Sequence, residues 1–490
     1  MFDNVLQSFD VVSLLIVAIF FLLVGYRPPW WIKKTAKYTS TNVSNIPGPL
    51  SLPILGTRWI FTFGGYSCGK IHEFYSDMYK KYGSVMKEEA LFNVPVISVF
   101  EKQDIEKVLR SSGKYPIRPP TEAIAQIRRQ RPERYASTGI VNEQGQTWHY
   151  LRTTLTSDLT SPKTISEFIP QIEAIADDWC NLLTQLKDTK GQIDDMHQVI
   201  GRLGLEVTCA LVLGRRMGFL IPGQESDSAQ ILAKAVHDHF LAVRDTYFGL
   251  PFWKLFPTSA YKQLEQSEET IYKIAMELIE TADDSTKESA IFQSVLRANV
   301  DSREKTAAIV DFIAAGIHTL KNSLLFLLYL VATNINSQKK ILDDHSKNYL
   351  KACINESFRL LPTANCLARV TEEELTLSGH KVDAGSVLLC HTGIACRNEN
   401  NFTNPNNFIP ERWLDEQKSI TSSNATFLVT PFGVGRRICP GKRLIEQVLP
   451  IIVDATVKKF HIKEVTALEL QFEFLLSAKG PMAMIFEERR

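Results

Sequence analysis

The sequence predicts a mainly helical protein with a small β part. Apolar residues recur at helical spacing almost continuously over about residues 165–360. Two shorter segments, 84–99 and 366–392, contain the alternating and β-branched residues that are typical of strands. Neither internal repeats nor low-complexity segments interrupt the chain. We therefore expect one large, mostly α-helical domain rather than a string of small ones.

Residues 11–26 form an uncharged apolar segment ahead of that domain. A helix of this length spans about 24 Å, slightly less than the roughly 30 Å of a bilayer core, and the tryptophans that follow can extend it into the interface. No Arg or Lys precedes Arg27, which disfavours a signal peptide and a mitochondrial transit peptide. The basic residues after the segment predict a cytoplasmic domain. We expect a membrane anchor with a basic, proline-rich hinge over 1–37 and the large domain over 38–490.

Bulk composition excludes several classes of function. Lys and Arg total 55 and Asp and Glu total 54, so the net charge of +1 gives no indication of a nucleic-acid partner. The 44% hydrophobic content suits a sizeable core. The 8 cysteines are scattered without a C-x-x-C pair. This spacing argues against a zinc site and against a secreted disulfide framework.

Individual elements follow from local patterns along the chain. The first strong helix is expected at about 71–81, followed by two strands within 84–99. The longest apolar run, 304–334, predicts a helix about 45 Å long that crosses the whole domain. This run is apolar on most faces and is therefore expected to be buried. A second membrane span is the competing interpretation, which Asp311 and the other polar residues inside the run disfavour.

The segment 431–441, PFGVGRRICPG, places one cysteine in a glycine-rich loop just before a predicted helix. Glycines allow a close backbone approach, and backbone N–H groups together with a helix N-terminus favour a thiolate at Cys439. A metal-ligating cysteine needs both features. The alternative is a glycine-rich turn around a structural cysteine. The pattern has five fixed positions: Phe432, Gly435, Arg437, Cys439 and Gly441.

This loop resembles that of the cytochrome P450 haem-thiolate monooxygenases, and further matches occur in the expected order from about residue 46 onward. The resemblance implies the P450 fold and a haem b whose iron is ligated by Cys439. It also implies a monooxygenase that uses O2 and NADPH-derived electrons through a redox partner. Phe432 and Gly441 would shape the cofactor loop.

Three arginines are expected to bind the haem propionates. Trp148 and Arg152 lie four residues apart, which places them on one helix face. In the family such a pair reaches a propionate, and arginine offers both a cation and hydrogen-bond donors. Arg369 and Arg437 resemble the other propionate partners. Alone, the Trp–Arg pair is also compatible with simple packing or a cation–π contact.

A second family pattern joins Glu356 and Arg359, three residues apart on a helix, with Arg412 in a Pro-Glu-Arg-Trp segment. The resemblance implies a buried, hydrogen-bonded charge triad with a structural role, which fixes the loop that presents Cys439. Loss of one partner would leave buried charges without compensation. An exposed helix pair is the plainer interpretation of Glu356 and Arg359 alone.

The middle of the long helix resembles the oxygen-side pattern of the family. Ala315 and Gly316 would let O2 and substrate approach the backbone, and Thr319 would relay protons while oxygen is activated. His318 departs from the family, which usually has an acidic residue there. A histidine can shuttle protons because its ordinary pKa is near 6.5. It can equally be a core residue that faces other helices, so both interpretations stay open.

Several stretches narrow the resemblance to the mitochondrial-type clan and, within it, to insect ecdysteroid hydroxylases. Lys442 and Arg443 resemble the basic pair that receives an acidic ferredoxin, although two solvated cations are the alternative. The resemblance implies hydroxylation of the steroid ecdysone at carbon 20. A short connection around 282–292 departs from the pattern, as does His318. The similar stretches are 118–122, 131–137, 139–145, 213–220, 359–369 and 472–476.

Other outcomes remain open at this point. The same fold could serve another sterol or xenobiotic hydroxylase, or a haem-binding protein without turnover. The electron donor is expected to be a ferredoxin or NADPH-P450 reductase. The anchor favours the cytoplasmic face of the endoplasmic reticulum membrane, whereas the clan favours a mitochondrial membrane.

Overall fold

The computed structural model describes residues 45–90, 93–156, 161–214, 216–221, 227–280, 295–414 and 425–489. The predicted anchor and hinge over 1–37 lies outside the described residues. The division at residue 38 therefore stays a prediction.

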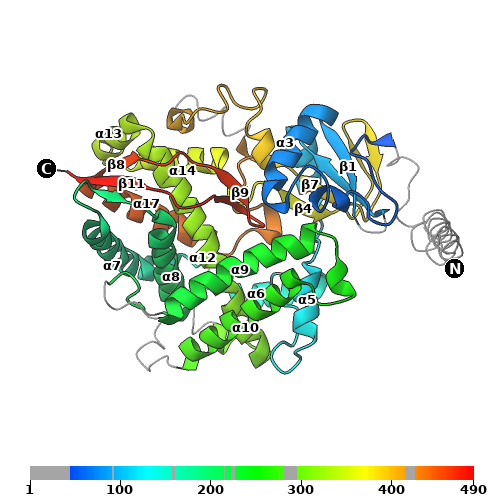
Figure 1. The fold of residues 1–490 in the computed structure, drawn as a ribbon, viewed down its shortest axis with the longest axis horizontal. Helices are drawn as coiled ribbons and strands as arrows, with labels where there is room; N and C mark the ends of the chain where they lie inside the picture. The colour runs from blue at the N-terminus through cyan, green and yellow to red at the C-terminus, as the bar shows by residue number, and fades with distance from the viewer. Residues whose placement is uncertain are drawn as a thin grey trace, which may run out of the picture.

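A four-stranded sheet forms one side of the molecule (Figure 1). β1 and β2 pair antiparallel, β2 and β7 pair parallel, and β7 and β4 pair antiparallel. The predicted strand regions 84–99 and 366–392 are thus confirmed and meet in one sheet. The bounds are β1 Val85–Glu89, β2 Pro95–Val99, β7 Val387–Cys390 and β4 Leu367–Val370, with the small hairpin β5 Leu375–Leu377 and β6 His380–Val382 beside them.

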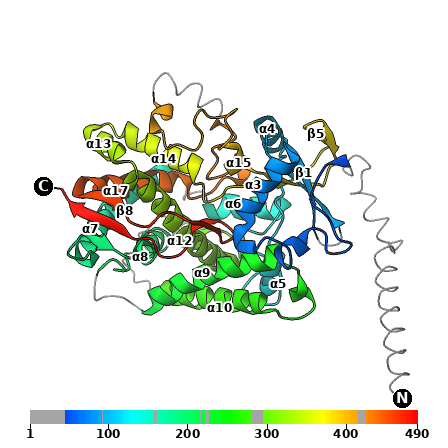
Figure 2. The ribbon, with the colours of Figure 1, turned by 45° about the horizontal axis from the view of Figure 1, so that its top comes forward.

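The rest of the described chain is mostly helical, as predicted. Helices α9 and α10 run side by side, and α12 passes through the middle of the helical part (Figures 1 and 2). The helices are α3 Ile71–Tyr82, α4 Lys102–Arg110, α5 Glu122–Arg129, α6 Gly145–Thr156, α7 Pro162–Leu186, α8 Met196–Leu213, α9 Asp227–Phe248, α10 Ser259–Glu280, α12 Ser302–Ala332, α13 Ile335–Asp343, α14 Asn348–Leu360, α15 Thr392–Ala395 and α17 Lys442–Lys459.

The long helix expected over 304–334 is α12, which packs against α8, α9, α10 and α14. Close packing against α8 requires small residues. A Cβ at Gly204 would come 3.2 Å from the carbonyl oxygen of Ile317, and a Cβ at Gly316 would come 2.8 Å from Thr208 Cγ2. The main hydrophobic core lies where α7, α8, α12, α14 and α17 meet.

Both α8 and α12 are long and apolar enough to cross a membrane by length and composition alone. However, 83% of the apolar window of α8 and 61% of that of α12 are buried inside the protein. Both helices are therefore explained as core helices, which agrees with the interpretation favoured for 304–334.

The C-terminal segment returns to the helical part as two small sheets. β8 pairs with β11, which also pairs with β3, and β9 pairs with β10 in a hairpin that contacts α12. Phe474 in the turn of this hairpin has a φ of 67°. The bounds are β3 Gln192–Ile193, β8 Phe460–Glu464, β9 Leu470–Phe472, β10 Leu476–Ala478 and β11 Met484–Glu488, and the 3-10 turns are η2 Arg58–Phe61, η3 Cys68–Lys70, η6 Phe252–Lys254, η8 Pro410–Trp413 and η9 Gly435–Arg437.

Candidate active site

The cysteine loop has the tight geometry that its glycines suggest. Gly433 and Gly435 adopt φ values of 73° and 70°, which side chains rarely tolerate. The Cys439 backbone N–H donates to the Phe432 carbonyl oxygen at 2.8 Å and closes the loop. The Phe432 ring packs edge-on against Phe358 of α14, with centroids 5.4 Å apart. The loop is therefore closed by its own backbone, and the Phe432 ring anchors it to α14.

The Cys439 thiol keeps accessible surface, although protein atoms surround much of its sulfur. The residue is exposed, yet burial still raises the pKa of its thiol. Backbone N–H groups of Gly441 and Lys442 and the guanidinium of Arg152 oppose that shift. The first turn of α17 thus points amides at the sulfur, as the sequence suggested.

Four guanidinium groups gather beside this loop. Arg437 Nε donates to the Pro116 carbonyl oxygen at 2.9 Å, and Arg152 Nη2 donates to the Ile438 carbonyl oxygen at 2.5 Å. Arg369 Nη2 donates to the Val434 carbonyl oxygen at 3.3 Å, while its buried Nε has no partner in the described part of the chain. Backbone carbonyls, and not carboxylates, therefore hold these arginines.

The fourth guanidinium belongs to Arg118. Burial, followed by repulsion from Arg118, Arg369 and Arg152, lowers the pKa of Arg437 to about 9. Within the described ranges no carboxylate forms an ion pair with any of the four. Such a cluster is matched to an anionic ligand with carboxylate or phosphate groups.

Trp148 and Arg152 lie on one face of α6, as predicted from their spacing. The guanidinium of Arg437 lies over the Trp148 ring, with Cζ 3.9 Å from the ring centroid. The structure thus brings together Trp148, Arg152, Arg369 and Arg437, which the sequence had singled out.

The middle of α12 has an accessible stripe within an otherwise buried helix. Ile313 and Ile317 are buried, whereas Ala315 is exposed and Thr319 is half-buried. The Thr319 hydroxyl donates to the Ala315 carbonyl oxygen at 2.7 Å, which leaves its oxygen free to accept. Gly316 faces Thr208 of α8, so one reason for this glycine is helix packing. The predicted approach of O2 at Gly316 stays a prediction.

His318 lies beside that stripe in a buried polar cluster. Its ring stacks on Phe240 of α9, with centroids 4.2 Å apart. Nε2 lies 3.2 Å from Asn322 Nδ2 and 3.5 Å from Glu473 Oε2. Burial lowers the pKa of His318 well below its ordinary value. The imidazole is therefore neutral near pH 7.

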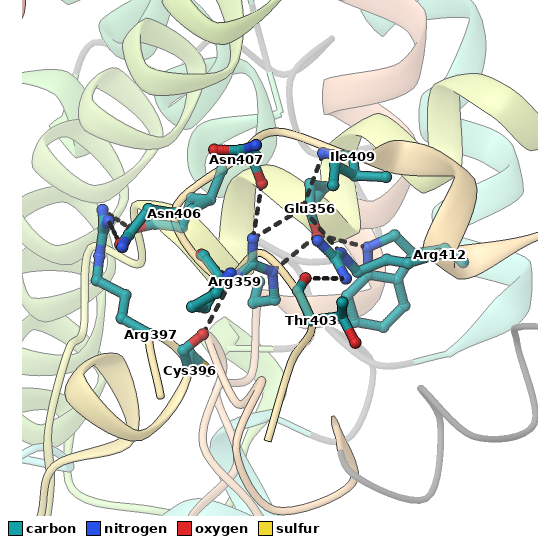
Figure 3. A network of polar contacts seen from close by, with 12 residues as sticks. Glu356, Arg359, Cys396, Arg397, Thr403, Asn406, Asn407, Ile409 and Arg412 are labelled. Atoms are coloured by element: carbon teal, nitrogen blue, oxygen red, sulfur yellow. Dashed lines mark hydrogen bonds and ion pairs between the residues drawn. The ribbon is translucent and has the colours of Figure 1, made fainter. Parts of the chain in front are cut away.

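The predicted charge triad is present as a buried network (Figure 3). Glu356 accepts from Arg359 Nε at 2.9 Å, from Arg412 Nε at 3.0 Å and from the Ile409 backbone N–H at 3.0 Å. Arg359 also donates to the carbonyl oxygens of Cys396, Pro405 and Asn407. The network therefore ties α14 to the segment that leads toward the cysteine loop. Its effect on Cys439 stays a prediction.

The sequence did not predict a site role for two residues of this region, Arg118 and Glu473. Arg118 lies in 118–122, one of the stretches that resemble the insect ecdysteroid hydroxylases, but no spacing pattern marks it as a neighbour of Arg437. Glu473 likewise lies in a similar stretch, but nothing local indicates that it faces His318. Both contacts join segments that are far apart in the chain, so only the folded structure reveals them.

Comparison with known proteins agrees with this geometry. The family model described as Cytochrome P450 matches residues 46–485. The chain is 42% identical over 479 residues to the ecdysone 20-monooxygenase of Drosophila melanogaster, covering 91% of this chain and 88% of that protein.

More distant relatives include two proteins whose names contain the word mitochondrial. Cytochrome P450 302a1, mitochondrial, of Drosophila melanogaster is 27% identical over 441 residues, covering 85% of this chain and 89% of that protein. The 1,25-dihydroxyvitamin D(3) 24-hydroxylase, mitochondrial, of Mus musculus is 27% identical over 444 residues, covering 86% and 84%. Membership of this family implies haem held by a thiolate and O2-dependent redox chemistry. The chain belongs to the cytochrome P450 family and is a P450 monooxygenase.

Proposed function

We propose that this chain hydroxylates ecdysone at carbon 20 to give 20-hydroxyecdysone. The observation that carries the proposal is the 42% identity over 91% of the chain to the Drosophila melanogaster ecdysone 20-monooxygenase. Steroid substrates of other kinds fit the same family. No observation favours a xenobiotic hydroxylase or a haem-binding protein without turnover.

The residues present fit a haem with two propionates. Arg118, Arg152, Arg369 and Arg437 form a cluster of cations that repel one another, and Arg369 Nε is buried without a partner in the described residues. Two carboxylates placed among them would relieve the repulsion and satisfy that nitrogen. Cys439 would hold the haem iron as a thiolate, which Arg152 and the backbone N–H groups of Gly441 and Lys442 favour.

When bound through a thiolate, haem supplies activation of O2 for the insertion of one oxygen atom into a C–H bond. The residues of the chain would orient the substrate and deliver protons. Ala315 leaves room on the accessible stripe of α12, and the Thr319 hydroxyl presents an oxygen there that can accept and return a proton.

A ferredoxin is the electron donor that we propose. The relatives whose names contain the word mitochondrial support this choice, and so do Lys442 and Arg443 in the first turn of α17, because an acidic donor would be attracted to cations there. The same relatives favour a mitochondrial membrane for the protein, with 1–37 as its anchor. The endoplasmic reticulum, expected from the anchor alone, stays a prediction, as does NADPH-P450 reductase as donor.

The test is turnover of ecdysone by the purified, haem-loaded chain. Parallel reactions would contain a ferredoxin system or NADPH-P450 reductase, and mass spectrometry would identify the product. A 20-hydroxylated product supports the substrate, and the donor that gives the faster turnover identifies the partner class. Absence of any hydroxylated product with both donors, in a preparation whose carbon monoxide spectrum shows thiolate ligation, would refute the ecdysone assignment.

A further inference from the structure

Monooxygenation consumes protons. One atom of O2 enters the substrate and the other leaves as water, so each turnover takes up two electrons and two protons. The electrons come from the redox donor, whereas the protons must come from solvent. A group that moves protons between solvent and the accessible stripe of α12 is therefore needed, and the described residues contain a candidate.

That candidate is centred on Glu473, in the turn between β9 and β10. Its side chain is 2% exposed, and Oε2 has no hydrogen-bond partner among the described residues. The same oxygen lies 3.6 Å from His237 Nδ1 and 3.5 Å from His318 Nε2. Oε1 accepts from Gln471 Nε2 at 2.7 Å, which fixes the orientation of the carboxylate. One carboxylate oxygen thus lies between two imidazoles.

The two histidines differ in their access to water. The side chain of His237, on α9, is 41% exposed, whereas that of His318, on α12, is 1% exposed. His318 is the neighbour of Thr319 in sequence and borders the accessible stripe. The three side chains therefore form a path from solvent to the interior, with a carboxylate in its middle.

A purely structural role explains this arrangement poorly. A buried carboxylate oxygen without a hydrogen bond is expensive, by about 1–3 kcal/mol or more. The hairpin is already joined to α12 by a hydrogen bond from Ser477 Oγ to Asn322 Oδ1 at 3.1 Å. The contacts of Glu473 at 3.5–3.6 Å are longer than hydrogen bonds, so a small side-chain movement or one water must close each gap before a proton is transferred.

We propose that Glu473 is a positioning residue that passes protons from His237 to His318. His318 is the inner end of the path and precedes Thr319 in α12. The inference rests on the monooxygenase reaction proposed above. In each hand-over an N–H bond of His237 breaks as an O–H bond forms on Glu473, and that bond breaks as an N–H bond forms at His318 Nε2. His318 then releases the proton of its other ring nitrogen toward the stripe. No electron moves and the total charge is restored, but His318 is left with its proton on Nε2, so proton exchange with water must restore the starting tautomer before the next proton passes.

The charged surroundings are compatible with this role. Burial, followed by repulsion from Lys321 and from histidines of α8 and α9, lowers the pKa of His318, so the ring is neutral and does not keep a second proton. Burial also lowers the pKa of Lys321, while attraction to Glu473 and Asp195 opposes that shift. The titratable and polar groups that face the relay are Lys321 and Asn322 of α12, Asp195 and His197 at the start of α8, Lys234, Asp238 and His239 of α9, and Gln471 and Ser477 of the hairpin.

The experiment compares Glu473→Gln with a matched change on the same hairpin, Glu469→Gln. Glu469 is exposed and pairs with Lys479 at 2.9 Å, away from the relay. In the full-length, haem-loaded protein, we expect Glu473→Gln to lower product formed per NADPH by about tenfold or more, since a positioned proton-transfer group contributes at least that much. Peroxide should rise, and the solvent deuterium isotope effect on turnover should increase. Glu469→Gln should match the wild type.

A second variant keeps the proposal testable if Glu473→Gln does not fold. His237→Ala changes only the exposed end of the path. It should lower coupling in the same direction, and added imidazole should restore it, which a structural defect would not allow. Wild-type coupling and isotope effects in both variants would overturn the relay.

Failure of the substrate assignment would be seen separately. If the wild type does not hydroxylate ecdysone, the proposed substrate is wrong. The relay is then measured from the ratio of peroxide to water formed from O2 during NADPH consumption, a ratio that needs no steroid product.

Discussion

The guanidinium of Arg437 lies over the indole of Trp148, with Cζ 3.9 Å from the ring centroid. The same guanidinium donates to the carbonyl oxygen of Glu143 at 2.8 Å and to Gln144 Oε1 at 2.7 Å. One side chain therefore joins the cysteine loop to the start of α6. These contacts fix the position of the cysteine loop relative to α6, and they also fix where the Arg437 guanidinium lies within the arginine cluster.

Replacing this arginine should weaken haem binding. Arg437→Leu removes a charged donor from the cluster, and a hydrogen bond to a charged group contributes about 1.5–3 kcal/mol. We expect haem to dissociate at least about tenfold faster, measured as transfer to excess apomyoglobin. Arg436→Leu, at the exposed neighbouring position, is the matched control. Equal transfer rates for the two variants would contradict a propionate contact at Arg437.

The network around Glu356 makes a prediction about stability. Glu356→Gln removes the charge that two buried guanidinium groups share, and breaking a buried pair costs about 3–5 kcal/mol. We expect a large fall in the free energy of unfolding, measured by urea denaturation. Glu167→Gln breaks an exposed pair with Lys163, 3.8 Å away, and should change it by less than about 1 kcal/mol. A similar small change in Glu356→Gln would show that the network is not essential to the fold.

Sequence patterns predicted the elements but not the contacts between distant segments. The helix expected over 304–334 is α12, Ser302–Ala332, because uninterrupted apolar periodicity is a local signal. The pairing of β2 with β7 could not be predicted, since it joins residues near 97 to residues near 388 through a parallel ladder.

The residues of the candidate site also fall into two groups, those that local spacing marks and those that only the fold brings together. Cys439, Trp148 and Arg152 could be singled out because fixed spacing marks them. Arg118 and Glu473 could not, since their roles depend on which distant groups the fold places beside them. The sequence left His318 open between a core residue and a proton relay. The structure shows it to be both buried and next to a carboxylate.

The hydroxyl of Thr319 is expected to control coupling. Thr319→Ala leaves the helix intact but removes the Thr319 hydroxyl from the accessible stripe described above. Peroxide formed per NADPH should rise and hydroxylated product should fall by about tenfold or more, as loss of a proton-transfer group predicts. Thr319→Ser keeps the hydroxyl and should retain most of the coupling. Unchanged coupling in Thr319→Ala would exclude Thr319 from proton delivery.

A buried histidine away from the site predicts how stability depends on pH. His391 stacks on Phe100, with centroids 4.7 Å apart, and its Nε2 lies 3.0 Å from Ser98 Oγ. Burial lowers the pKa of His391 to about 3. Below the ordinary value near 6.5 the unfolded chain binds a proton that the native state excludes. Folding stability from this residue is therefore lost as pH falls, by about 2 kcal/mol between pH 8 and pH 5.

His391→Phe keeps an aromatic ring beside Phe100 but removes the titrating group. We expect the free energy of unfolding of this variant to fall less between pH 8 and pH 5 than that of the wild type, by about 2 kcal/mol. Ser98→Ala is the matched control, because it removes the same hydrogen bond and leaves the imidazole in place. It should lower stability by a similar amount at both pH values. If His391→Phe retains the full pH dependence of the wild type, a group other than His391 causes it.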